Sequence, residues 1–200
     1  AERVSKELLK LLAASDPVPT VEVMAHTGIL AHLLPEARTL EAFRAMAAVT
    51  GDPLLRLSSL LPGSAEALDV AARGLRLSNR EMARLQGLIG PELDLETLED
   101  RQGRAQVYAE GKQATADQLV RALSQKPALR DRFDAFKALV DTWPVPRLPV
   151  GGREVAALGV APGPDTGALL KAFEADWIAD DFPETGHVER LRALRDQREG

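Results

Sequence analysis

Apolar residues in this 200-residue chain recur at steps of three and four, and proline or glycine ends each such stretch. Residues 2–14, for example, place four apolar side chains on one helix face, and Pro17 follows them. No stretch of useful length alternates apolar and polar residues as a half-buried strand does. Aromatic residues make up only 4% of the chain, while leucine and alanine dominate. We therefore predict an all-α fold, an elongated array of small helical modules.

Residue types at the predicted helix ends support this fold. Ser78 and Glu81 have the spacing of a capping box, in which each side chain accepts a backbone N–H of the other. Pro53 and Pro164 suit first helical positions, where the missing N–H costs nothing. We also expect Thr20 to cap a short helix.

The proline-rich stretch "PVPRLP" at residues 144–149 predicts a stiff, extended boundary between modules. We therefore place a module boundary at this segment. The sequence opens inside a helical pattern and without methionine, so we expect it to be a fragment of a longer protein.

Composition excludes several classes of function. The chain has no cysteine, which rules out disulfides and thiolate metal sites and fits a reducing cytoplasm. No apolar run approaches the roughly 20 residues that a membrane helix needs. The formal net charge of −5 argues against broad coating by nucleic acid but allows a local basic patch.

Catalytic and metal-binding patterns are absent from the sequence. His26, His32 and His187 lack the spacing and carboxylate neighbours of a zinc site, so we expect partly buried structural histidines. There is no phosphate-binding loop, dinucleotide fingerprint or nucleophile elbow. We assign no catalytic residue and no metal ligand.

Arginines are the stronger indication of function. Four of them step at three and four residues across the end of one predicted helix and the next: Arg73, Arg76, Arg80 and Arg84. The planar guanidinium group can donate two hydrogen bonds to one phosphate. An ordinary solvated helix face is the competing interpretation for each.

The stretch at residues 148–173 carries five glycines and three prolines, yet its apolar residues recur regularly. This pattern predicts a tightly turned pair of helices in which Gly167 lets another backbone approach closely. Free N–H groups at the start of the second helix could seat a phosphate. Asp165 argues against that seat because it satisfies the same dipole. A plain helical hairpin is the alternative.

Four stretches, in order, resemble bacterial class II tRNA nucleotidyltransferases, the family of CCA-adding enzymes and poly(A) polymerases. "AERVSKELLKLL" resembles a motif of the neck domain, "LRLSN" the helical body, and "RAQVYAEGKQATADQLV" a later step of that body. "LPVGGREVAALGVAPGPDTGALLKAFEADWIADDF" is similar to the tail of the alphaproteobacterial branch. Arg153-Glu154 departs from the Asp-Leu common there, and Pro62-Gly63 stands where some relatives carry a phosphohydrolase His-Asp pair, so we expect no hydrolase activity.

The resemblance implies that residues 1–40 end the neck domain, that residues 41–143 form the helical body and that residues 144–200 form the tail. It also implies that a missing N-terminal head holds the catalytic carboxylates, Mg and CTP or ATP. The fragment would be inactive alone and would bind no cofactor itself. Glu2, Arg3 and Glu7 would brace the nucleotide-binding neck. Body and tail would hold tRNA, with no membrane or DNA partner, while the parent enzyme adds or repairs the 3′ CCA end or adds A.

The residues that we nominate for RNA contact combine arginines with glycines whose backbone N–H groups can approach phosphates. They are Arg73, Arg76, Arg80, Arg84, Gly151, Gly152, Arg153, Gly163 and Gly167. A helical protein-interaction scaffold without any role in RNA binding is the competing function.

Overall fold

The computed structural model describes residues 2–37, 40–89 and 92–199. Over these residues it contains thirteen α-helices, one 3-10 helix and no strand, which confirms the all-α prediction. The helices are α1 (Glu2–Leu12), α2 (Val18–His26), α3 (Ile29–Leu33), α4 (Glu41–Val49), α5 (Pro53–Leu60), α6 (Ala65–Leu75), α7 (Asn79–Gln86), α8 (Asp100–Glu110), α9 (Lys112–Gln125), η1 (Pro127–Leu129), α10 (Arg130–Thr142), α11 (Gly152–Ala157), α12 (Pro164–Ala179) and α13 (His187–Glu199).

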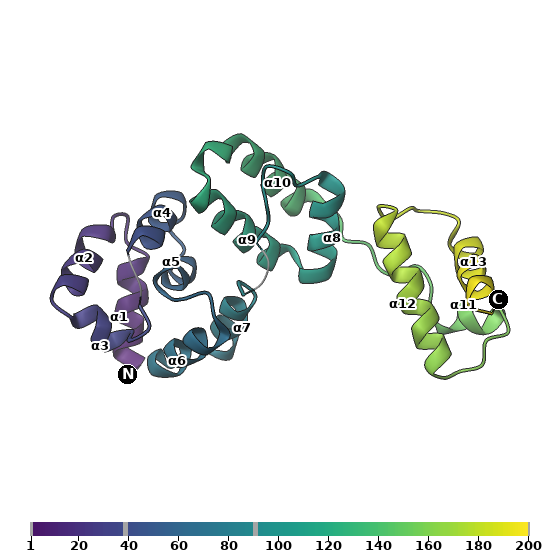
Figure 1. Ribbon diagram of the computed structural model, residues 1–200, viewed down its shortest axis with the longest axis horizontal. Helices are drawn as coiled ribbons and strands as arrows, with labels where there is room; N and C mark the ends of the chain where they lie inside the picture. The colour runs from purple at the N-terminus through teal and green to yellow at the C-terminus, as the bar shows by residue number, and fades with distance from the viewer. Residues whose placement is uncertain (1, 38–39, 90–91, 200) are drawn as a thin grey trace.

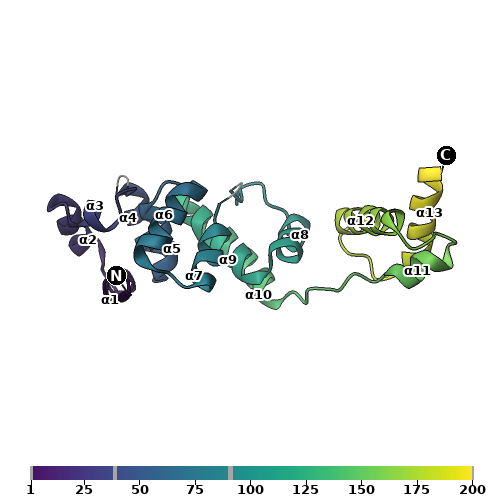
Figure 2. The same cartoon turned by 90° about the horizontal axis from the view of Figure 1, so that it is seen from below.

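The molecule is elongated. Its helices follow one another from α1–α3 at one end to α11–α13 at the other, with α8–α10 between them (Figure 1). The same order is visible from below in Figure 2, where residues after α10 run as an extended segment toward α11.

Most predicted helix starts are confirmed. The Ser78 N–H donates to Glu81 Oε2 at 2.7 Å and the Glu81 N–H donates to Ser78 Oγ at 3.3 Å, which completes the capping box of α7. Pro53 and Pro164 begin α5 and α12. The prediction for Thr20 was wrong, because α2 begins two residues earlier and Pro17 is its N-cap. Prolines need no N–H partner in a first turn, so the helix includes Pro19 instead of starting after it.

The first hydrophobic core runs from Leu8 to Leu88 and joins α1–α3 with α4–α7. Arg56, only 3% exposed, reinforces it from within. Its guanidinium group donates to the carbonyl oxygens of Leu12 at 2.6 Å and Ala14 at 2.7 Å, and also to Ala47. These carbonyls lie at or just past the C-terminal ends of helices, where they lack helical partners. Residue 40 therefore marks no break in the packing, and the three-part division stays a prediction.

The second core is formed by α8–α10 and the segment before α8, from Leu95 to Val140. Gly103 is buried in the middle of α8 because α10 packs closely against it. A Cβ at this position would meet the Phe136 ring at 3.4 Å. The glycine that weakens α8 as a helix thus permits its contact with α10.

The third core, from Val150 to Leu191, belongs to α11–α13. Leu169, Phe173 and Trp177 of α12 are buried in this core. The prediction for Gly167 was wrong, since no described atom lies within 4 Å of a Cβ built there. Gly167 is exposed on the solvent side of α12.

Candidate RNA-binding surface

Arg3 and Glu7, two of the three residues expected to brace the neck, lie exposed on α1. They border an apolar hollow of about 330 Å³ whose other walls come from α1, α2 and α3. Those walls are Val4, Leu8, Leu11, Met24 and Leu33. The side chain of Glu2 lies outside the described residues.

Three of the four stepped arginines are exposed around the turn between α6 and α7. Arg73 pairs with Asp69 one helical turn earlier, at 3.4 Å, but its side chain stays 72% exposed. Arg76 adopts a left-handed conformation at the end of α6, with φ of 51°. Arg80 lies exposed in the first turn of α7.

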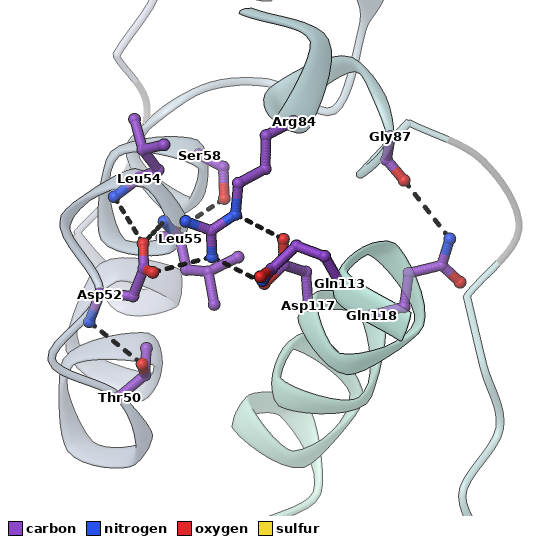
Figure 3. Close-up of polar contacts among 10 residues, drawn as sticks. All are labelled: Thr50, Asp52, Leu54, Leu55, Ser58, Arg84, Gly87, Gln113, Asp117 and Gln118. Carbon is purple, nitrogen blue, oxygen red and sulfur yellow. Dashed lines mark hydrogen bonds and ion pairs between the residues drawn. The ribbon is translucent and has the colours of Figure 1, made fainter. Parts of the chain in front are cut away.

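Arg84, the fourth, faces two carboxylates instead of solvent (Figure 3). Its Nε and Nη2 atoms each donate to Asp117 at 2.7 Å, and Nη2 also donates to Asp52 at 2.8 Å. The hydrogen bonds to Asp117 raise the pKa of Arg84, and the single hydrogen bond to Asp52 adds to the effect. The Arg84 side chain is 23% exposed and that of Asp117 only 5%. Arg84 therefore ties α7 to α5 and α9.

Asp52 has two roles in this network. One carboxylate oxygen accepts the N–H groups of Leu54 and Leu55 and so caps α5, while the other accepts from Arg84 (Figure 3). The cap places the carboxylate at the start of α5, where α7 can reach it. The sequence gives no local sign that Asp52 and Asp117 are partners of Arg84, because they lie 32 and 33 residues away.

The tail residues nominated for RNA contact include one exposed cation, Arg153. One of the backbone N–H groups nominated there already donates to a carboxylate of the protein. The Arg153 side chain is 94% exposed beside Glu154. The Gly151 N–H donates to Glu154 Oε2 at 2.9 Å, and this bond is the main cause that lowers the pKa of Glu154. The Gly151 amide thus has a partner within the protein, while Gly152 lies exposed at the start of α11.

Gly163 and Gly167 lie exposed at the beginning of α12. A hollow of about 370 Å³ next to them is lined by both signs of charge, from Asp165, Arg195 and Arg198. Arg195 already donates to the Leu158 carbonyl at 2.8 Å. The start of α12 therefore meets one carboxylate as well as two guanidinium groups.

The structure places the candidate residues in two groups that do not touch. The arginines of α6 and α7 lie on one side of the α8–α10 module, and the tail residues lie on the other (Figure 1). One RNA would have to cross this module to contact both groups.

A set of contacts that sequence analysis missed connects α8 with the tail. Arg104 of α8 donates to both carboxylate oxygens of Asp181, at 2.7 and 2.6 Å. The Tyr108 hydroxyl donates to Glu174 Oε1 at 2.7 Å. We call this contact the α8–tail joint and define it by Arg104, Tyr108, Trp143, Glu174, Trp177, Asp181 and Phe182.

The α8–tail joint also has an aromatic centre. The Phe182 ring lies 5.3 Å from Tyr108, 5.1 Å from Trp143 and 5.0 Å from Trp177, measured between ring centroids. Phe182 is 9% exposed. Burial, followed by the hydrogen bond to Glu174, raises the pKa of Tyr108 to about 12.

Two consecutive residues of the joint have left-handed backbones. The φ angles are 61° at Asp181 and 60° at Phe182, and neither residue is glycine. Each such conformation costs roughly 1–2 kcal/mol. Strain of this kind persists where surrounding contacts hold the backbone in place. Here these contacts are the Arg104–Asp181 ion pair and the packing of the Phe182 ring.

The histidines differ from expectation. His26 and His32 are exposed, not partly buried, because the chain breaks at Gly28 between α2 and α3 and leaves both on the solvent side. His187 is half-buried, and its ring centroid lies 6.3 Å from that of Phe173. Among the described residues, no three His, Asp or Glu side chains gather in a way that could hold a metal ion. No described helix is both long and apolar enough to span a membrane.

The fold and surface define an elongated all-helical region with separate groups of exposed arginines. Comparison with known families found a match to the first part of the chain. A family model described as "Probable RNA and SrmB-binding site of polymerase A" matches residues 1–41, which include α1–α3 and the hollow beside Arg3. No curated protein matched the chain. The match covers residues 1–41 and supports an RNA-binding region of poly(A) polymerase type there.

Proposed function

We propose that this chain holds tRNA for a nucleotidyltransferase that adds or repairs the 3′ CCA end, or adds A, from CTP or ATP. The observation that carries the proposal is the match of residues 1–41 to an RNA-binding region of polymerase A. In this proposal Mg and the nucleotide bind to a head domain elsewhere in the parent enzyme, and the chain described here contributes no catalytic group. The cytoplasm is its proposed location.

The proposed mechanism is recognition of RNA shape. An A-form helix presents phosphates and 2′-hydroxyls across a shallow minor groove, which a rigid protein can contact without reading bases. The exposed arginines at 73, 76 and 80 would contact one stretch of phosphates, and Gly152 with Arg153 another. Arg84 is left out of this proposal because its guanidinium group is bound to Asp52 and Asp117.

A fluorescence anisotropy titration of the chain with labelled tRNA, repeated over a salt series, tests this function. Phosphate contacts predict that log K falls as log salt rises, by about 0.9 per duplex phosphate neutralised. Unlabelled single-stranded RNA of equal length should compete poorly. Absence of salt-dependent binding, or equal competition by the single strand, would contradict the proposal.

Single substitutions then identify the contacts. We expect Arg80→Ala and Arg153→Ala each to reduce the salt slope by about one phosphate and to weaken binding across RNA sequences alike. Arg44→Ala is the matched control, because Arg44 is also exposed but pairs with Glu22 at 2.8 Å. Equal losses from the control and the two test variants would show that only overall charge matters.

The hollow on α1–α3 supports a second candidate, a protein-binding scaffold. Its lining is mainly apolar, and Val23 and Ile29 nearby are 60% and 49% exposed. Apolar surface of this kind suits a protein better than a phosphate backbone. Val4→Glu would place a charge in the hollow, and we expect it to leave tRNA affinity unchanged if the hollow serves a protein. A loss of tRNA affinity in that variant would assign the hollow to RNA.

A further inference from the structure

We propose that the α8–tail joint determines RNA specificity by fixing the distance between the two groups of candidate RNA contacts. This inference rests on the proposed function, since it concerns how one tRNA reaches both groups. It assigns positioning roles to Arg104, Asp181 and Phe182, none of which is itself a candidate for RNA contact.

The covalent connection alone leaves the tail free to rotate. Residues 144–149 contain three prolines and no helix, and they run extended from α10 toward α11 (Figure 2). A proline-rich segment keeps its length but does not fix the orientation of the helices attached to its far end. A second attachment between the tail and the α8–α10 module is needed to set that orientation.

The α8–tail joint supplies this second attachment at the opposite end of the tail from α11. Arg104 holds Asp181 through two parallel hydrogen bonds, which constrain angle as well as distance. Arg101 adds a bond to the Ala179 carbonyl, at 3.2 Å, where α12 ends. The linker and the joint together connect the tail to the α8–α10 module at more than one residue, and this restricts rotation of the tail about the linker.

The turn after α12 directs these groups toward α8. The Phe182 N–H donates to the Trp177 carbonyl at 2.9 Å, which closes the turn while both Asp181 and Phe182 are left-handed. This backbone sends the carboxylate to Arg104 and the ring between Tyr108 and Trp143. Contacts from three parts of the chain therefore converge on two adjacent residues.

A fixed separation favours an RNA whose own phosphates have the same separation. Once one group of contacts is bound, the second contact becomes intramolecular, and its strength depends on how well the spacing is held. A flexible tail would bind the same phosphates but would lose this advantage. The joint should thus favour folded tRNA over a hairpin that reproduces only one arm of it.

The chain's chromophores report directly on the joint. The sequence has two tryptophans and one tyrosine, and all three, Trp143, Trp177 and Tyr108, belong to the joint. Opening the joint should shift tryptophan emission to longer wavelength and increase the radius of gyration in small-angle scattering. Both measurements are independent of RNA.

The test compares Arg104→Met and Phe182→Ala with Arg44→Met in the full chain. Arg44→Met removes an exposed interhelical ion pair far from the joint and controls for the lost charge. We expect both joint variants to open the joint by fluorescence and scattering and to weaken tRNA binding by about tenfold, with unchanged affinity for the single-arm hairpin. An open joint with undiminished preference for tRNA would overturn the inference.

Two further outcomes separate this inference from the function on which it rests. Failure of the wild-type chain to bind tRNA would overturn the proposed function and this inference together. Normal tRNA binding by the wild type, combined with joint variants whose fluorescence and scattering do not change, would overturn only the assignment of the joint. The Arg104→Asp/Asp181→Arg double variant should restore part of the lost tRNA affinity if the ion pair positions the tail.

Discussion

Removing Arg84 should destabilise the protein far more than removing an exposed arginine, because it leaves the buried Asp117 carboxylate without a charged partner. In Arg84→Met, Asp117 would keep only the Gln113 amide, which donates to it at 3.0 Å. Its side chain is 5% exposed, so water cannot replace the guanidinium group. Breaking a buried pair costs about 3–5 kcal/mol. Because Arg84 and Asp52 stay 23% and 28% exposed, we expect about 3 kcal/mol here.

The assay is urea unfolding at neutral pH, followed by far-ultraviolet circular dichroism and compared with Arg44→Met. The control breaks the Arg44–Glu22 pair, whose side chains are 53% and 43% exposed, and should cost less than about 1 kcal/mol. Asp117→Asn should cost about 1–2 kcal/mol, since Arg84 keeps Asp52 and the amide still accepts a hydrogen bond.

The double variant Arg84→Met/Asp117→Asn decides the cause. It removes the unpaired charge, so its free energy of unfolding should exceed that of Arg84→Met alone. Two results would refute the reasoning: a loss from Arg84→Met no larger than that of the control, or additive losses in the double variant. Either would mean that water reaches Asp117.

Two other predictions concern groups that sequence analysis did not single out. Arg56→Met should lower the free energy of unfolding in urea by about 3 kcal/mol, because three carbonyl groups near helix ends lose their buried donor. Arg56→Lys should recover less than half of this loss, since one ammonium group cannot reach all three carbonyl oxygens. Tyr108 should ionise near pH 12 in an ultraviolet titration of this single tyrosine, and Phe182→Ala should bring its pKa back toward 10. Because the pKa of Tyr108 is raised in the folded state, the stability that this residue contributes is complete below about pH 10 and is lost as the pH rises through about 12. A pKa near 10 in the wild-type protein would contradict the burial of the phenol.

The helices were predictable because their signals are local. Ser78 and Glu81 are three residues apart, and the prolines that begin α5 and α12 act through their own missing N–H groups. The errors were also local in kind. Thr20 does not cap α2, because that helix begins at Val18. The exposure of His26 and His32 depended on where the chain turns at Gly28.

The candidate site was predictable only as residue types. The sequence indicated that Arg80 and Arg84 belong to one series, but one is exposed and the other binds two carboxylates. That difference depends on the position of Asp117 on another helix. Likewise, "EADWIADDF" gives no local sign that Asp181 would meet Arg104, 77 residues earlier.

By itself, the sequence determined the all-α fold, most helix starts and the extended proline segment, because these depend on backbone sterics and hydrogen bonds within a few residues. Only the tertiary structure decided which arginines are bound to carboxylates, which glycines lie in contacts between helices and how the tail is attached to α8. Those outcomes depend on pairs such as Arg84–Asp117 and Arg104–Asp181, whose partners are brought together by the packing of separate helices. A charged side chain takes its role from the groups that surround it after folding, and residue order alone does not specify those groups.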